Sequence, residues 1–315
     1  MENRNSCEFQ KFQIEKFDKK KTRPIANNVF QLYNFFKKSA ICDTMNFMKR
    51  IFSRAFFSAL IFILSFSCAS SMRGENFYDD IFQNADSIQL EIPLCKAAEK
   101  NSERRDTHQI VRHEGYTLCY REKFEQAEWV AYTLDAEKLQ KAASRKNNFR
   151  EDPDVKTFSA QLEDYRHSGY DRGHLAPAAD MAYSEIAMSE SFLMSNISPQ
   201  VHAFNAGIWL RLEEYVRTLA GESEKIFVVT GPILEKDSYE TIGVNRVAVP
   251  EFFYKAILAL KNGELKMFAF IIPNEQSKEE IWHFQTTVDE IEARTGIDFF
   301  WQLDDEIENA LECRK

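Results

Sequence analysis

The feature that most constrains the fold is the dipeptide Asn262-Gly263, which separates two long apolar segments. Asn-Gly is strongly preferred in a two-residue turn between antiparallel strands, because both turn positions require a positive φ. The flanking residues 251–260 and 265–272 are rich in aromatic and aliphatic side chains, as strands are. The second half of the chain is therefore predicted to contain an antiparallel hairpin.

Other segments extend this strand-rich pattern. Residues 116–120 and 128–134 have strand character and are joined by the polar residues 121–126, which predicts another antiparallel hairpin. Residues 225–230 are mostly apolar, as in a buried strand. Strands joined by hairpins, with few crossovers, predict an α+β domain with a mainly antiparallel central sheet flanked by helices.

Two helices are predicted from the signals at their ends. Thr287 and Glu290 have the spacing of a capping box, and Gly296 is expected to end the helix that they begin. Residues 205–219 are predicted to form a second helix that stops at Gly221.

Residues 45–71 have the pattern of an export signal. Lys49, Arg50 and Arg54 precede the apolar residues 55–66, and small residues follow. This apolar run is shorter than the roughly 20 residues that a membrane-spanning helix needs. We therefore expect an exported protein that is periplasmic, extracellular or an outer-membrane lipoprotein, and an uncleaved anchor is the alternative.

The export signal divides the chain. Because a signal peptide normally begins a protein, residues 1–44 are interpreted as a non-native upstream extension or a disordered segment. Residues 72–107 are interpreted as a linker. Residues 108–315 are then the globular domain, which is long enough to bury one sizeable core.

The cysteines leave two questions open. Cys68 follows the apolar run as in a relaxed lipobox, where it would carry a lipid and tether the protein to a membrane. The same residues also suit an ordinary signal peptidase, which would release the protein. If Cys68 is lipidated, Cys95, Cys119 and Cys313 can form at most one disulfide, which an exported chain permits.

Residues 170–217 concentrate the groups that phosphodiester hydrolysis requires. His174 is a candidate general base, because imidazole titrates nearest neutrality. Arg172 offers a planar guanidinium that pairs with phosphate, and Gly173 permits a close approach to the backbone. Mg²⁺ keeps much of its water shell and needs few protein oxygens, so the side chain of Asn205 is a sufficient ligand.

Glu213 and Arg217 complete this set. If one regular helix carries Asn205 and Glu213, their side chains point in directions about 80° apart around the helix axis. Their Cα atoms are then separated by about 12 Å along that axis. Glu213 is then expected to contact metal-bound water or to orient Arg217. The structural alternatives are an N-cap for Asn205 and a helix-surface ion pair for Glu213 with Arg217.

Three motifs in this region occur together: D-R-G-H at residues 171–174, N-x-x-P-Q at 196–200, and N-x-x-x-W-x-x-L-E at 205–213. Together they resemble the DNA/RNA non-specific endonucleases of the ββα-metal (His-Me finger) superfamily, and the likeness runs from about residue 112 to the C-terminus. The resemblance implies a ββα-metal catalytic motif and an endonuclease that cleaves DNA and RNA with little sequence specificity, leaving 5′-phosphate ends.

The resemblance also implies roles for individual residues. His174 is implied to be the general base, Asn205 the direct ligand of Mg²⁺, Mn²⁺ or another divalent cation, and Glu213 a contact of the ion's water shell. Asn196 matches a family asparagine with a supporting role. The arginines implied to handle phosphate or the leaving group are Arg150, Arg172 and Arg217. Both a monomer and a homodimer remain open.

The net charge of −9 is unusual for a protein whose substrates are DNA and RNA. Neutralisation of phosphates normally dominates affinity for nucleic acid, so we expect a local basic groove, weak binding and strong inhibition by salt. The groove would include Arg145 and Lys146. A catalytically inactive, nuclease-fold surface module that binds nucleic acid is the alternative function, and the intact catalytic positions disfavour it. A toxin delivered to competitors is a narrower alternative.

Overall fold

A computed structural model describes residues 89–94 and 107–314, which belong to one compact unit beginning at Gln89. The expected export signal, Cys68, Cys95 and most of the expected linker lie outside the described residues. Within residues 89–94 and 107–314, no helix is both long enough and apolar enough to cross a bilayer.

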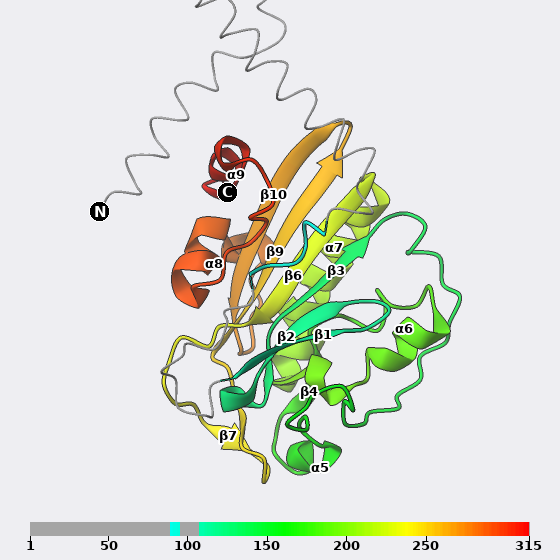
Figure 1. Cartoon of the computed structure of the whole chain (residues 1–315), viewed down its shortest axis with the longest axis vertical. Helices are drawn as coiled ribbons and strands as arrows, with labels where there is room; N and C mark the ends of the chain where they lie inside the picture. Colours follow the sequence, from blue (N-terminus) through cyan, green and yellow to red (C-terminus); the bar gives the residue numbers. More distant parts are fainter. Residues whose placement is uncertain (1–88, 95–106, 315) are drawn as a thin grey trace, which may run out of the picture. The chain divides into compact units, whose positions relative to one another are not determined.

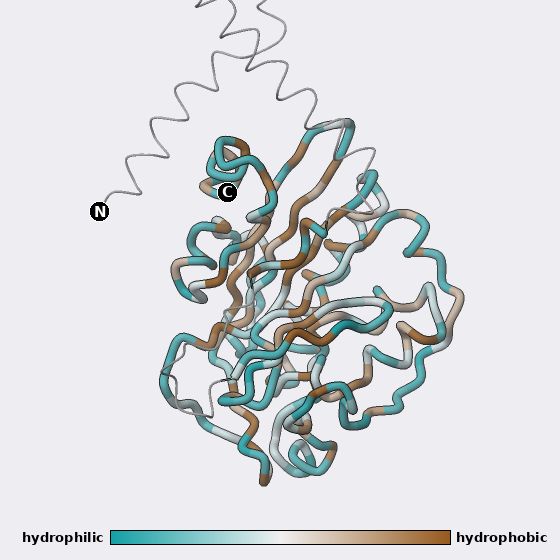
Figure 2. The backbone as a smooth tube through the Cα atoms, viewed as in Figure 1, coloured by the Kyte–Doolittle hydropathy of each residue, from teal (hydrophilic) through white to brown (hydrophobic). Residues whose placement is uncertain are grey.

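The centre of the domain is a seven-stranded antiparallel sheet with the strand order β1-β2-β3-β6-β9-β10-β11 (Figure 1). This confirms the predicted α+β class. Figure 2 shows that hydrophobic residues concentrate in the central strands and hydrophilic residues in the surrounding loops. The strands are β1 (His108–Arg112), β2 (Thr117–Arg121), β3 (Gln126–Leu134), β6 (Lys225–Pro232), β9 (Phe252–Lys261), β10 (Glu264–Pro273) and β11 (Gln285–Thr286).

Both predicted hairpins are confirmed. β9 and β10 pair around Asn262 and Gly263, whose φ angles of 55° and 72° are those of a two-residue hairpin turn. β2 and β3 also pair antiparallel, but a 3₁₀ turn, η1 (Glu122–Phe124), and a register shift between Cys119 and Tyr120 interrupt the hairpin.

Shorter elements surround the sheet (Figure 1). Two small antiparallel ribbons lie outside it: β4 (Asp171–His174) with β5 (Ile197–Gln200), and β7 (Thr241–Ile242) with β8 (Val247–Ala248). The helices are α5 (Leu162–Tyr165), α6 (Glu185–Glu190), α7 (Leu210–Gly221), α8 (Val288–Thr295) and α9 (Asp305–Glu312), with 3₁₀ turns η2 (Met194–Asn196) and η4 (Ile281–Phe284) and the π-helix η3 (Phe204–Trp209).

The helices pack on both faces of the sheet. Successive side chains of a strand point to opposite faces, so Phe253 and Tyr254 of β9 identify what covers each one. The Phe253 ring lies 5.3 Å from that of Phe204 and 5.7 Å from that of Trp209, just before α7. The Tyr254 ring lies 5.5 Å from that of Phe299, in the loop between α8 and α9. α7 therefore covers one face, and the α8–α9 region covers the other.

α8 begins and ends at the predicted residues, and the Thr287 side of the predicted capping box is present. The Oγ1 of Thr287 accepts a hydrogen bond from the backbone N–H of Glu290 at 3.2 Å, and Gly296 ends the helix with φ 63°. The following loop contacts residues 89–94: the indole of Trp301 and the side-chain amide of Gln302 both donate to the carbonyl oxygen of Ile92. These contacts hold the start of the compact unit against its C-terminal part.

Candidate active site

The β4–β5 ribbon carries the first candidate group. Gly173 pairs with Ser198, and His174 pairs with Ile197. A Cβ atom added to Gly173 would lie 2.1 Å from the side chain of Gln200, so a larger residue does not fit beside this buried glutamine. The group that approaches the Gly173 backbone closely is therefore the side chain of Gln200. This contact fixes the path of the strand that carries His174.

His174 lies among aromatic rings. Its imidazole centroid is 5.6 Å from that of Phe149 and 5.0 Å from that of Phe192. The Nε2 atom is buried and has no hydrogen-bond partner among the described residues. Burial, reinforced by the positive charges of Arg145 and Arg172, lowers the pKa of His174 to about 3. The imidazole is therefore neutral near pH 7, as a proton acceptor must be.

Two exposed arginines cover the same aromatic rings. The Arg172 guanidinium lies 4.3 Å from the Phe149 ring centroid, and that of Arg145 lies 5.0 Å from that of Phe192. Cation–π contacts of this kind hold a guanidinium in place while its N–H donors stay accessible. The structure thus places two positive charges around His174, of which Arg145 comes from the irregular segment before β4.

The segment that carries Asn205 differs from the prediction. Phe204–Trp209 is a π-helix, and Gly207 has the non-helical angles φ −113° and ψ −109°. Regular α-helix begins only at Leu210, so the expectation of one continuous helix from Asn205 to Arg217 was wrong, and its 80° projection does not apply. π-helical turns are often found at functional sites, where they redirect a side chain.

Asp171 orients the side chain of Asn205. The Nδ2 of Asn205 donates a hydrogen bond to the Oδ2 of Asp171 at 2.9 Å, and His202 Nδ1 lies 2.9 Å from the same oxygen. Because the amide nitrogen is engaged, the Oδ1 of Asn205 is the atom left to face a ligand. This bond ties the π-helix to β4.

A pocket of about 530 Å³ opens beside these groups and is lined by Arg145, Phe149, Asp171, Arg172 and Asn205, among others. A carbonyl-type oxygen in a polar pocket with room for water is a suitable donor for a hard divalent cation. The donor set therefore fits the ion that the sequence predicts. His174 adjoins this pocket through its contact with Phe149.

Glu213 and Arg217 both lie on α7, but Arg217 forms its ion pair with another carboxylate. Its Nη1 donates to the Oδ1 of Asp180 at 2.8 Å, and the Tyr132 hydroxyl donates to the Oδ2 of Asp180 at 2.9 Å. Asp180 is fully buried. The guanidinium of Arg217 is thus held by a residue 37 positions earlier, which the i, i+4 pattern did not indicate.

A buried lysine lies in the same region. The ammonium of Lys255 on β9 donates to the Oγ1 of Thr230 at 3.2 Å and lies 4.6 Å from the Trp209 ring centroid. Burial raises the pKa of the Glu213 carboxyl and lowers that of the Lys255 ammonium, while each charge favours the ionised form of the other. α7 therefore covers a set of compensating charges.

The remaining predicted residues contact the backbone. Buried Asn196 accepts from the N–H of Ala176 and donates to the carbonyl oxygens of Ala176 and Ser191, each at 2.9 Å. It therefore braces the segment that follows His174. Exposed Arg150 donates to the carbonyl oxygen of Ser189 at 2.8 Å, which connects it to α6.

The motifs and the fold agree with a known family. Residues 96–306 match the family model described as DNA/RNA non-specific endonuclease. The chain belongs to the DNA/RNA non-specific endonuclease family. The predicted resemblance is therefore confirmed, and the ββα-metal fold is consistent with it.

This member of the endonuclease family is similar to mitochondrial nucleases. It is 40% identical over 201 residues to nuclease EXOG of Danio rerio, covering 59% of this chain and 59% of that protein. It is 37% identical over 205 residues to endonuclease G of Homo sapiens, covering 61% and 69%. A crystal structure of the EndoG/EndoGI complex matches with a TM-score of 0.59 and 35% identity, covering 62% of this chain and 86% of that chain. The family member thus spans about three fifths of the EXOG relative's length.

Three residues that the structure adds to the candidate site were not among the predicted site residues. Asp171 stands within the D-R-G-H motif, yet its bond to Asn205 depends on the folded chain. Asp180 has no motif around it. Lys255 did have a signal, because a lone charged residue inside an apolar strand is rarely buried unless it has partners.

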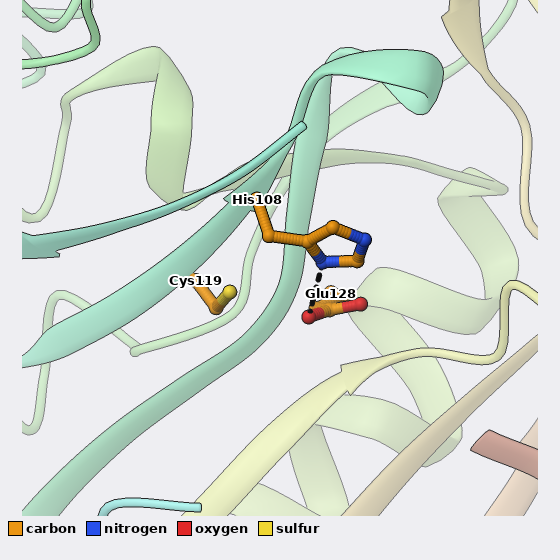
Figure 3. Close-up of side chains that lie close together, drawn as sticks. All are labelled: His108, Cys119 and Glu128. Carbon is orange, nitrogen blue, oxygen red and sulfur yellow. Dashed lines mark hydrogen bonds and ion pairs between the residues drawn. The ribbon is translucent and has the colours of Figure 1, made fainter. Parts of the chain in front are cut away.

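A second cluster of potential metal ligands lies away from the site. His108, Cys119 and Glu128 lie close together, and the Nδ1 of His108 is 2.8 Å from the Oε1 of Glu128 (Figure 3). Cys119 is disulfide-bonded, as is Cys313. Metal binding by cysteine requires a thiolate, so Cys119 does not supply a ligand here.

Proposed function

We propose that this chain is an exported, divalent-cation-dependent endonuclease. It hydrolyses phosphodiester bonds in DNA and RNA with little sequence specificity and leaves 5′-phosphate ends. The observation that carries this proposal is the arginine-lined pocket that holds the Asn205 amide, oriented by Asp171, and that is also lined by Phe149, the ring that contacts the neutral imidazole of His174.

His174 accepts the proton of the water that attacks phosphorus in line with the leaving oxygen. Its low pKa keeps the imidazole unprotonated and also makes it a weaker base than an imidazole that titrates near neutral pH. The aromatic rings around it exclude competing solvent. Asn205 would hold Mg²⁺, Mn²⁺ or a similar ion through Oδ1, and Glu213 would contact water bound to that ion. When bound, the ion supplies positive charge to the 3′-side oxygen that leaves.

The arginines divide the work of holding phosphate. Arg172 and Arg145 present exposed guanidinium groups over the aromatic rings beside His174 and bind non-bridging oxygens. Arg217, fixed by Asp180, balances the charge that grows on the reacting phosphate. Arg150 contributes one more positive charge near α6. Because the chain as a whole is acidic, substrate affinity depends on this local group and falls steeply with salt.

Export is part of the proposal and is supported by the signal-like residues 45–71. The disulfide-bonded Cys119 and Cys313 also fit an oxidising compartment. Lipid attachment at Cys68 would tether the enzyme to a membrane and is tested by metabolic labelling with a fatty acid. The mitochondrial names belong to the relatives.

The decisive experiment compares supercoiled plasmid and structured RNA as substrates of the full chain, with Mg²⁺, Mn²⁺ or chelator. We expect cleavage of both substrates, its loss in chelator, and a fall of about 10²-fold or more for His174→Ala and Asn205→Ala. His283→Ala, an exposed histidine away from the site, is the matched control and should retain activity. End-labelling should require prior phosphatase treatment if the ends carry 5′-phosphate.

The same assay separates the two functional classes. A nuclease-fold module that only captures nucleic acid would bind the plasmid without nicking it under every ion condition. Undiminished cleavage by His174→Ala would overturn the assignment of the general base.

A further inference from the structure

A group of carboxylates joins the last two helices on the sheet face opposite α7. Asp289 and Glu292 belong to α8, and Glu312 ends α9. One carboxylate oxygen from each of these residues lies within 4.8 Å of the others. The three side chains come from segments about 20 residues apart, so the fold has brought like charges together.

Glu312 distinguishes this group from an ordinary acidic surface. It is only 6% exposed, and its Oε1 has no hydrogen-bond partner within residues 89–94 and 107–314. A buried carboxylate without a donor is costly, because it loses its hydration and gains nothing in return. The carboxylate is nevertheless directed towards two others.

Within the described part of the chain, the charged neighbours that shift the pKa of Glu312 most are all acidic: Glu292, Glu308, Asp289 and Asp298. Burial, followed by repulsion from these neighbours, raises the pKa of Glu312 to about 9. The arginine of α8, Arg294, is already paired with Glu235, its Nη2 lying 2.5 Å from Oε1.

The carboxylates are also held in place. Glu292 Oε1 accepts a hydrogen bond from the backbone N–H of Phe299 at 2.9 Å. Glu312 precedes Cys313, which is disulfide-bonded, and Asp304 caps the start of α9 by accepting from the N–H of Glu306. A preorganised set of oxygens binds a cation at a lower entropic cost than flexible side chains do.

We propose that Asp289, Glu292 and Glu312 bind a Ca²⁺ ion that joins α8 to α9. Ca²⁺ takes six to eight oxygen ligands at about 2.3–2.6 Å, so two oxygens on opposite sides of the ion lie about 5 Å apart, which accommodates this group. Water completes the shell on the side of Asp289, which is exposed. The ion here is structural and separate from the one at Asn205.

Thermal unfolding of the full chain tests this site. The measurement uses the Asn205→Ala variant, so that an ion at the nuclease site does not contribute. With a dissociation constant on the order of 1 mM, as in extracellular calcium modules, 10 mM Ca²⁺ should raise the Tm by about 4 °C over chelator.

Two further variants in the same background locate the ion. Glu312→Gln should abolish the Ca²⁺-dependent rise, whereas Glu306→Gln, an exposed glutamate of the same helix, should retain it. If Glu312→Gln does not fold, the exposed ligand variant Asp289→Asn replaces it with the same expectation. The proposal is overturned if Ca²⁺ produces no rise in the Asn205→Ala protein, or if the rise survives both ligand substitutions.

Discussion

The two faces of the central sheet handle buried carboxylates differently. Beneath α7, Asp180 and Glu213 lie among their own counter-ions, Arg217 and Lys255. On the other face, the described neighbours that shift the pKa of Glu312 most are all acidic. The same kind of group is thus neutralised from within on one face and left with like charges on the other.

This difference shows on which face the protein's own groups balance the buried charges. Buried charges are stable when cations and hydrogen-bond donors surround them, and removing one member then leaves an uncompensated charge. The α7 face meets this condition with protein groups alone. The α8–α9 face meets it only when a cation comes from solution, so opposite consequences are expected when a charge is removed from each face.

The largest effect is expected for Asp180→Ala. This substitution leaves Arg217 and Lys255 with excess positive charge and removes the acceptor of the Tyr132 hydroxyl. We expect the free energy of unfolding to fall by about 3–5 kcal/mol, measured by urea denaturation. Asp289→Asn, on the other face, is the control and should not destabilise the protein in chelator. A neutral result for Asp180→Ala would mean that α7 does not depend on this carboxylate.

The next effect is a coupling between Asp180 and Lys255. Their charges lie in one cluster, so the double variant Asp180→Asn with Lys255→Met should lose less stability than the two single variants add up to. The expected coupling is about 0.5–3 kcal/mol, measured by a double-mutant cycle in urea. Strictly additive losses would show that the two charges do not compensate each other.

A smaller change of opposite sign is expected on the acidic face. Because the pKa of Glu312 is raised to about 9, folding near neutral pH requires this carboxyl to take up a proton. In chelator, Glu312→Gln removes that requirement and should raise the free energy of unfolding by about 1 kcal/mol. The exposed Glu306→Gln should change it much less. A marked loss of stability in Glu312→Gln would indicate that Glu312 has a favourable partner in the free protein.

The smallest change is expected in the nicking rate as the pH falls below neutrality. Because the pKa of His174 is depressed to about 3, the imidazole stays neutral as the pH falls through 6.5, its ordinary value. The initial rate of plasmid nicking at saturating Mg²⁺ should therefore change by less than about 3-fold between pH 7 and pH 5.5. A fall with a midpoint near pH 6.5 would show that His174 is hydrated in the working enzyme.

The sequence by itself determined the features that depend on neighbouring residues. The turn at Asn262-Gly263 follows from local backbone preferences. The helix cap at Thr287 forms because its hydroxyl accepts a hydrogen bond from the backbone N–H of Glu290, three residues later. The family followed from three closely spaced motifs. α9 also had a local signal, the Asp304 cap, although it was not among the predicted helices.

Only the tertiary structure decided which groups meet across long separations. Asp171 orients Asn205 from 34 residues away, and Arg217 pairs with Asp180 although Glu213 is nearer in sequence. The π-helix around Asn205 also escaped prediction, because the periodicity of a sequence does not record how rings pack on a distant strand. Partners and burial are set by the packed sheet, and these in turn set the charge of each side chain.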